Sequence, residues 1–232
     1  MELTQSRSVR TEEEAARVVS SGKRLPRLWL GLSAGLRLAL NPKDTQQVFL
    51  LAAAVDRDRL ASNHERLRST AAGRALLAKR PAIDASAVDY AALRALPEDT
   101  LGGAYARMLL REHLDPDLFQ APPGLPAELA YVAQRIRQTH DLWHVLTGLG
   151  TDIPSEVALQ AFTQQQIGSE TARLITLFGQ LFFGLRFPQL RSLVRKYRAL
   201  GQRAVYLLEV PWEEMWEHRL ADVRSELGLT LG

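Results

Sequence analysis

The residues whose types and spacing favour chemistry are two histidines and two carboxylates in one stretch of the chain: His140, Asp141, His144 and Glu156. On an α-helix of about 3.6 residues per turn, the first three fall within an arc of about 100°, with the histidines about 40° apart. Positions four apart lie about 5 to 6 Å from each other at Cβ, so both imidazoles can reach one ion at about 2.0 to 2.1 Å. The spacing therefore predicts a divalent-metal site. Imidazole suits zinc, iron, nickel or copper, and carboxylate also suits magnesium and manganese.

Glu156 belongs to the next predicted helix, twelve residues after His144 and beyond a glycine-containing turn. Asp152 is the expected N-cap of that helix, and Pro154 suits its first turn. There the free N–H groups and the helix dipole favour an ionised carboxylate. A short connection can fold this helix back beside the first, so a single helix–turn–helix would supply all four ligands.

Simpler interpretations of the same residues stay open. Two histidines and an adjacent acid can form a polar patch over an aromatic core, and Asp152 and Glu156 can be ordinary acids at a helix start. The remaining histidines have no comparable neighbours, and we expect them at the surface or at helix caps: His64, His113 and His218. The chain has no cysteine, which excludes disulfides, thiolate zinc sites and iron–sulfur clusters. Any metal must therefore rest on His, Asp and Glu.

The composition is that of a soluble globular protein with a sizeable core: 232 residues, 46% hydrophobic and 24% charged. The net charge of +3 is spread along the chain among acids, which argues against a nucleic-acid-binding face and allows a modest attraction to anionic lipid headgroups. The start lacks the apolar core of a secretory signal and is too acidic for a transit peptide. The longest apolar stretch, 174–187, is too short to span a bilayer. We expect a cytoplasmic, prokaryotic protein without a transmembrane segment.

Helix signals dominate the chain, and there is no convincing alternation typical of strands, so we predict an all-α, single-domain helical bundle. Residues 1–25 are expected to form an N-terminal extension with a short helix, and residues 26–232 the domain. The proline-rich stretch 115–126 is expected to be a surface loop. The main predicted helices lie at roughly 64–79, 100–109, 127–146, 152 onward, 169–186, 189–208 and 211–227.

The string HDLWHVLTGLGTDIPSEVALQAF, residues 140–162, resembles the signature of the coenzyme Q (ubiquinone) biosynthesis protein 4 family, in which HDxxH is followed by eleven residues and Glu. Segments at 96–117, 128–141 and 207–229 add to the resemblance, which covers about the last 200 residues. Residues 160–169 depart from the family pattern. Together with the missing transit peptide, this departure indicates a bacterial member whose substrate can differ.

The resemblance implies a divalent ion (zinc, iron or manganese) held by His140, Asp141, His144 and Glu156, and peripheral association with the inner membrane. It also implies metal-dependent oxidative decarboxylation of a polyprenylated benzoquinone precursor, with hydroxylation at the same ring carbon, C1. The alternative is a non-catalytic organiser that binds a prenyl or other isoprenoid lipid and other quinone biosynthesis proteins. A homodimer is the expected assembly. A phosphohydrolase of the HD type shares the His–Asp pair but normally needs a further His upstream and Asp downstream.

Three further residues are candidates for substrate binding. Arg137, one turn before Asp141, projects toward the same face and can hold a substrate carboxylate, although a surface salt bridge is an equally simple role. Phe178 and Phe182 belong to an apolar stripe proposed as a groove for the prenyl tail. A stripe at helical spacing is more often core, and it can also be a dimer face. The members of the stripe are Leu177, Phe178, Leu181, Phe182 and Leu185.

Overall fold

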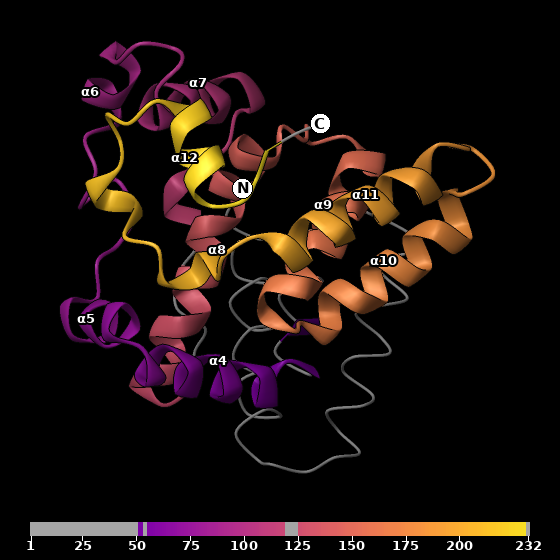
Figure 1. Ribbon diagram of the computed structural model, residues 1–232, viewed down its shortest axis with the longest axis horizontal. Coiled ribbons are helices and arrows are strands. Elements are labelled where there is room, and N and C mark those ends of the chain that lie inside the picture. Colours follow the sequence, from indigo (N-terminus) through magenta and orange to yellow (C-terminus); the bar gives the residue numbers. More distant parts are fainter. Residues whose placement is uncertain (1–50, 53–54, 119–124, 231–232) are drawn as a thin grey trace, which may run out of the picture.

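Helices and short 3-10 turns make up the regular structure of the described residues, 51–52, 55–118 and 125–230, in this computed structural model (Figure 1). The α-helices are α4 (Arg57–Ser69), α5 (Ala71–Lys79), α6 (Tyr90–Ala95), α7 (Leu101–Glu112), α8 (Ala127–Thr147), α9 (Ile153–Ile167), α10 (Glu170–Phe183), α11 (Leu190–Arg203) and α12 (Leu220–Glu226). The 3-10 turns are η1 (Pro116–Leu118), η2 (Leu207–Glu209) and η3 (Trp212–Glu214). Among these residues the β-pairing is limited to one bridge between Thr100 and Arg219. The all-α, single-domain prediction is confirmed, and the predicted extension 1–25 lies outside the described residues.

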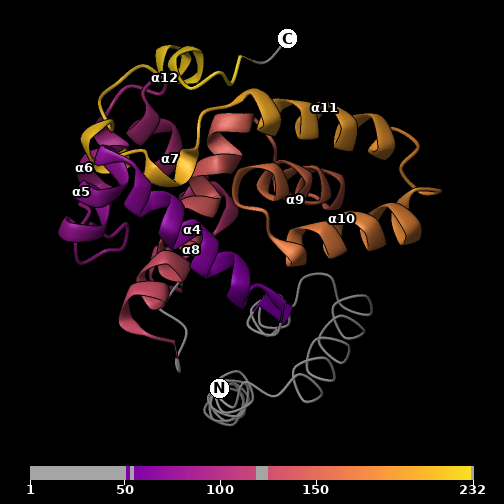
Figure 2. The same ribbon diagram turned by 60° about the horizontal axis from the view of Figure 1, so that its bottom comes forward.

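Three helices on one side of the molecule pack closely, with α9 between α10 and α11 (Figure 2). Glycines make the close approach possible. A Cβ added at Gly179 of α10 would lie 2.5 Å from a methyl group of Val157 on α9. A Cβ at Gly201 of α11 would lie 2.8 Å from the carbonyl oxygen of Phe162. Both glycines therefore fix how near α10 and α11 come to α9.

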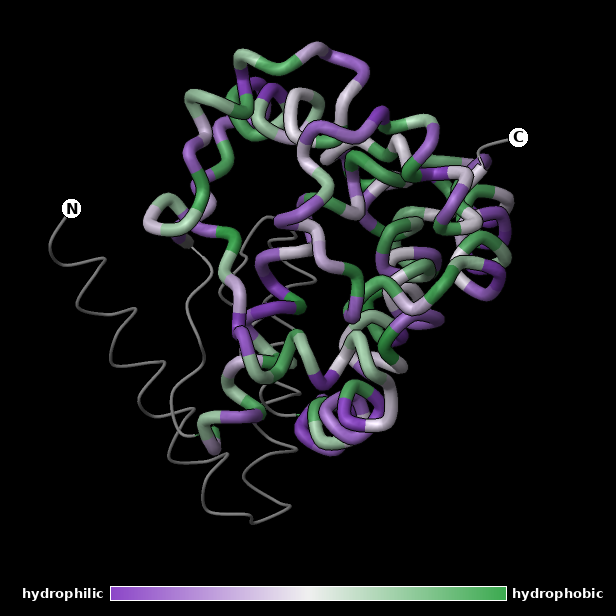
Figure 3. Tube along the Cα trace, turned by 60° about the vertical axis from the view of Figure 1, so that its left-hand side comes forward, coloured by the Kyte–Doolittle hydropathy of each residue, from purple (hydrophilic) through white to green (hydrophobic). Residues whose placement is uncertain are grey.

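The main core gathers around α8, which contacts α4, α7 and η2. Trp143 of α8 is fully buried and meets the ring of Phe162 edge-on, with 5.9 Å between the ring centroids. Hydrophobic and hydrophilic residues alternate along most of the trace, as amphipathic helices require (Figure 3). The helix that carries the two histidines is thus held from several directions, which is what a precisely placed set of ligands needs.

The C-terminal segment differs from the prediction. A single helix was expected over 211–227, whereas the structure has η3, an irregular stretch and the short α12. The buried guanidinium of Arg135 on α8 explains the break. It donates to both carboxylate oxygens of Glu213 and, at 2.9 Å, to the carbonyl oxygen of Val210. These contacts fix the backbone near Val210 and Glu213 in a conformation that is incompatible with one continuous helix. Tertiary contacts therefore override helix propensity here.

Candidate metal centre

One face of α8 brings His140, Asp141 and His144 together. A ligand atom from each residue lies within 4.8 Å of the other two. Asp141 and His144 are buried, with 5% and 2% of their surface exposed, whereas His140 is half-buried. The two imidazole rings stand edge to face, with centroids 5.0 Å apart. The cluster therefore has a closed side, formed by Asp141 and His144, and a more open side at His140.

Two side chains from other helices hold the end of α8 that carries His144. The guanidinium of Arg224 in α12 donates to the carbonyl oxygens of Val145 at 2.8 Å and Leu146 at 2.9 Å. The hydroxyl of Tyr197 in α11 donates to the carbonyl oxygen of Thr147 at 3.1 Å. These carbonyls belong to the last turn of the helix, where partners inside the helix are missing. The helix end is thereby tied to two neighbouring elements.

The residue after the helix orients His144. Gly148 adopts a positive φ of 68° and ends α8, and the next carbonyl, that of Leu149, lies 3.3 Å from Nδ1 of His144. A carbonyl oxygen only accepts, so Nδ1 carries the hydrogen in this contact. The lone pair of Nε2 is then left for a metal. The sequence does not reveal this partner, because it is a backbone atom. The only hint in the sequence is Gly148, which marks the end of the helix.

The first turn of α9 places Glu156 against both histidines. The side chain of Asp152 caps α9 by accepting from the N–H of Ser155 at 3.1 Å. Oε1 of Glu156 then lies 3.3 Å from Nε2 of His144, and Oε2 lies 3.8 Å from Nε2 of His140. α9 packs chiefly on α10 and α11 and meets α8 near the turn, rather than lying along it as expected. Glu156 reaches the histidines because it is in that first turn.

The charges of the cluster depend strongly on one another. Burial raises the pKa of Glu156, but hydrogen bonds from His140 and His144 outweigh burial and leave the pKa below its ordinary value. Burial lowers the pKa of His140, but the hydrogen bond to Glu156 outweighs it and raises the pKa. Burial also raises the pKa of Asp141, against the opposing effect of the histidines. His140 and Glu156 therefore stabilise each other's charged form.

The arrangement fits a divalent ion. Two ligands on one ion at about 2.0 to 2.2 Å are typically separated by a little more than 3 Å, and the distances from Glu156 to the histidines, 3.3 and 3.8 Å, are close to that value. The donor set, two imidazoles and two carboxylates, suits zinc, iron or manganese. His140, Asp141 and His144 form the group whose ligand atoms come together, and Glu156 would complete the ligand set from its position beside the two histidines. The side chain of Glu156 is 38% exposed, so a ligand from solvent can approach on that side.

The remaining candidate residues lie on α8 and α10. Arg137 is half-buried on α8, one turn before Asp141. Phe178 and Phe182 stack on each other along α10, with centroids 6.1 Å apart, and are 43% and 57% exposed. Their neighbours Leu177, Leu181 and Leu185 are exposed as well, so the alternative that this stripe is core is wrong. No helix in the described ranges is both long enough and apolar enough to cross a membrane.

Known proteins resemble this chain in sequence and in fold. The protein from Drosophila sechellia described as "Ubiquinone biosynthesis protein COQ4 homolog, mitochondrial" is 32% identical over 213 residues, which covers 88% of this chain and 78% of that protein. The Bos taurus protein of the same description is 34% identical over 202 residues, covering 85% and 76%. A crystal structure from Nostoc punctiforme PCC 73102 matches the fold with a TM-score of 0.69 at 24% identity, over 87% of this chain and 98% of that one.

The family comparison extends across nearly the whole chain. Residues 20–231 match the family model described as coenzyme Q (ubiquinone) biosynthesis protein Coq4. That range includes α8, α9 and the four residues of the cluster. The chain therefore belongs to the Coq4 family of coenzyme Q (ubiquinone) biosynthesis proteins.

Proposed function

We propose that this protein is a metal-dependent enzyme of ubiquinone biosynthesis that removes the C1 carboxyl group of a polyprenylated benzoquinone precursor oxidatively and hydroxylates that carbon. The main support for the proposal is that the four residues of the cluster differ in their exposure to solvent. Asp141 and His144 are buried, whereas the side chains of His140 and Glu156 are 26% and 38% exposed. A structural ion is closed by protein ligands on all sides, and a catalytic ion keeps a position for water or substrate. The outward side of this cluster supplies such a position.

The reaction replaces a ring carboxyl group by a hydroxyl group and releases carbon dioxide. It is a two-electron oxidation of the ring carbon, for which we propose dioxygen as the electron acceptor: water supplies the oxygen of the new hydroxyl group, and dioxygen leaves as hydrogen peroxide. A bound iron or manganese ion would supply the oxygen chemistry, whereas zinc would polarise the substrate without redox chemistry. His144 is oriented for ligation by the Leu149 carbonyl. Arg137, on the same helix, is the proposed partner of the substrate carboxylate.

The prenyl tail has a candidate path along α10. Gly179 of α10 packs directly on Val157 of α9, so α10 lies against the helix that carries Glu156. The exposed stripe that contains Phe178 and Phe182 runs along this helix. Apolar side chains of this size favour contact with an isoprenoid chain or with the apolar layer of a membrane over contact with water.

The neighbouring helix supports binding to a membrane surface. α11 exposes cations without any acid in its sequence. An apolar helix face together with a basic helix in one protein favours peripheral binding to anionic bilayers. We therefore propose that α10 and α11 rest on the membrane, from which the substrate tail enters. The exposed cations of α11 are Arg191, Arg195, Lys196, Arg198 and Arg203.

The enzymatic proposal is tested by His144→Ala. The variant should lose bound metal and turn over no carboxylated quinone precursor, while circular dichroism shows a folded helical protein. His113→Ala, at the exposed C-cap of α7, is the matched control and should keep both properties. Turnover that persists in folded, metal-free His144→Ala would sink the enzymatic proposal.

The tail path is tested separately by Phe182→Asp. The exposed position tolerates the change in the folded protein, and the amount of prenyl lipid that co-purifies should fall. Retention of the same lipid by a folded variant would contradict the path. Loss of lipid with unchanged turnover would instead separate membrane binding from catalysis.

A second candidate function is favoured by the size of the exposed stripe on α10. Four large exposed apolar side chains on α10, with Leu185 just after its end, also suit a partner surface, in a homodimer or with other quinone biosynthesis proteins. In that case the ion holds α8 and α9 together, and the protein binds a prenyl lipid and partner enzymes without catalysing a reaction. Spectroscopic measurement of the coordination number separates the two functions. Four protein ligands without exchangeable water would favour the organiser.

A further inference from the structure

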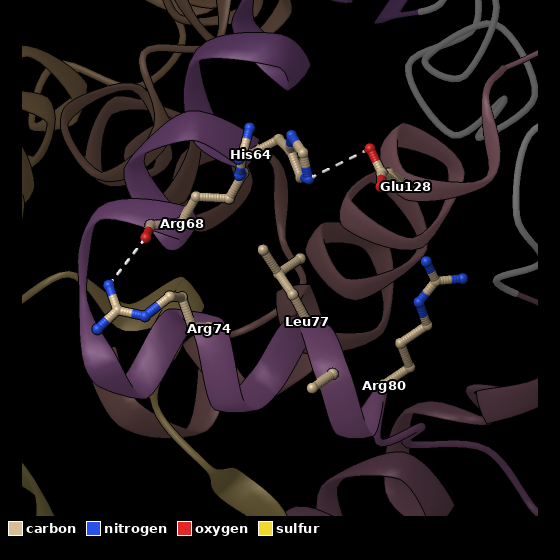
Figure 4. A pocket seen from close by; sticks show the side chains of 7 residues that line it. His64, Arg68, Arg74, Leu77, Arg80 and Glu128 are labelled. Atoms are coloured by element: carbon tan, nitrogen blue, oxygen red, sulfur yellow. Dashed lines mark hydrogen bonds and ion pairs between the residues drawn. The ribbon is translucent and has the colours of Figure 1, made fainter.

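The two ends of α8 are held by side chains from different helices. At its start, Glu128 lies 3.7 Å from Nε2 of His64 on α4, beside a polar hollow lined by arginines (Figure 4). Beyond its end, the turn that leads to α9 meets α7, where Oγ1 of Thr151 donates to Oε2 of Glu112 at 2.7 Å. This second contact bears on the metal centre, because it lies on the turn that joins the two helices that carry its candidate ligands.

Glu112 is the last residue of α7, and its carboxylate has a fixed orientation. The side chain is 27% exposed. Oε1 accepts from Nε of Arg111 at 2.9 Å, while Oε2 accepts from Thr151. α7 packs against α8 and buries its own apolar residues in the main core. Glu112 is therefore attached to a well-packed part of the molecule and can hold the turn in place.

Thr151 stands between the two parts of the turn that orient the candidate ligands. Two residues before it, the carbonyl oxygen of Leu149 lies 3.3 Å from Nδ1 of His144. Directly after it, Asp152 caps α9 and so determines where the first turn of that helix, with Glu156, begins. The connection between α8 and α9 is short, so a shift of Thr151 would displace both parts.

Electrostatics also place Glu112 near the cluster. Hydrogen bonds from Thr151 and Arg111 lower the pKa of Glu112, and the charge of His144 lowers it further. The carboxylate is thus close enough to His144 for the two charges to interact. Side chains that orient metal ligands without touching the ion typically contribute about 10- to 100-fold to metal affinity.

We propose that Glu112 is a positioning residue of the metal centre. By accepting the hydrogen bond from Thr151, it fixes the turn that orients His144 and Glu156, and it acts without contact to the ion or the substrate. The inference rests on the proposed metal-binding function of the cluster. It concerns the geometry of the ligands, however, which can be measured without metal.

The first experiment measures the affinity of the full-length protein for zinc by competition with a chelating dye. Glu112→Ala and Thr151→Val should each weaken binding by about tenfold. The double variant should bind no more weakly than either single variant, because both changes remove the same hydrogen bond. Glu112→Gln should recover most of the affinity, since its amide oxygen can accept from Thr151.

Glu98→Ala is the matched control. Glu98 lies just before the start of α7, is 84% exposed and pairs with Arg107 at 3.6 Å, so the variant loses the same charge beside the same helix. Its zinc affinity should equal that of the wild type. Equal losses in Glu98→Ala and Glu112→Ala, or the absence of any rescue by Glu112→Gln, would overturn the proposal.

The second experiment observes His144 in the metal-free protein by NMR. The nitrogen chemical shifts of its neutral imidazole report which ring nitrogen carries the hydrogen, and its signals are assigned by their absence from His144→Ala. The wild type should hold the hydrogen on Nδ1. Glu112→Ala should shift it toward Nε2, the nitrogen that must be unprotonated to bind a metal. Circular dichroism should show equal helix content in the two proteins, which separates the tautomer change from a general loss of structure.

Together the two experiments separate this inference from the proposed function. A wild type that binds no zinc, but whose tautomer depends on Glu112, would count against the metal centre and support the positioning role. A wild type that binds zinc, with affinity and tautomer both unchanged in Glu112→Ala, would overturn the positioning role and leave the metal centre supported.

Discussion

Helix α8 carries two clusters of buried charge only five residues apart, and they are built in opposite ways. The buried Arg135 donates to both carboxylate oxygens of Glu213 and to a backbone carbonyl, so its charge is compensated within the protein. At His140, Asp141 and His144, joined by Glu156, imidazoles and carboxylates face one another. A closed ion pair holds a segment in place, whereas converging acceptors prepare a position for a cation from outside.

The largest effect is expected when the closed cluster is broken. Glu213→Ala leaves the guanidinium of Arg135 buried without a counter-charge, and the free energy of unfolding should fall by about 3 to 5 kcal/mol. Chemical denaturation measures the change. Glu214→Ala is the control, because this neighbour is 66% exposed, pairs with Lys79 at the surface and should cost less than about 1 kcal/mol. Equal losses in the two variants would remove the distinction between a closed pair and a surface pair.

Mutation of the open cluster should change metal affinity more than it changes the stability of the metal-free protein. His140→Ala should lower the stability of the metal-free protein by less than Glu213→Ala does, because the side chains of the pair formed by His140 and Glu156 are 26% and 38% exposed. Affinity for zinc or manganese should fall by at least about 100-fold, or about 2.7 kcal/mol. Competition with a chelating dye measures the affinity. A variant that binds metal as tightly as the wild type would show that the cluster does not use His140.

A smaller effect is expected at the turn between α8 and α9. Gly148→Ala forces a side chain into the positive φ of 68°, which should cost about 1 to 2 kcal/mol of stability. It should also weaken metal binding by about tenfold, because the Leu149 carbonyl that orients His144 shifts. Gly168→Ala is the matched control, because it introduces the same strain (φ 67°) at the far end of α9, and it should leave metal affinity unchanged. Unaltered affinity in Gly148→Ala would remove the orienting role of the carbonyl.

The smallest effect is the pH dependence of the metal-free protein. Glu156 has a lowered pKa, so its contribution is present above its ordinary pKa of 4.5 and lost as the pH falls through the folded value. His140 has a raised pKa, so its contribution is present below its ordinary pKa of 6.5 and lost as the pH rises through the folded value. The pair therefore stabilises the fold most between these two pKa values.

Bound metal should reverse the dependence of stability on pH above 6.5, the ordinary pKa of His140. Without metal, stability should fall as the pH rises above 6.5, the ordinary pKa of His140, whereas with metal it should rise, because deprotonated ligands bind the ion. Denaturation at several pH values, with and without a chelator, tests this reversal. In Glu156→Gln the dependence of the metal-free protein should flatten. A wild type whose metal-free stability matches that of the variant at every pH would contradict the coupling.

The sequence predicts most of what is local and little of what depends on distant partners. The HDxxH spacing and Glu156 follow from helix periodicity and a capped helix start, and the structure brings these residues together. The break between η3 and α12 depends on Arg135, which is 78 residues from Glu213, so no local pattern reveals it. The exposure of Phe182 likewise depends on which neighbours cover α10.

The contact between His144 and the Leu149 carbonyl determines which positions of the turn tolerate substitution. Every amino acid has a backbone carbonyl, so an exchange at position 149 keeps the acceptor even when packing suffers. The position that cannot vary freely is Gly148, which makes no contact with the imidazole in this interaction but sets the direction of the chain. A mutational scan scored by metal retention should therefore find position 148 intolerant and position 149 permissive to other apolar residues.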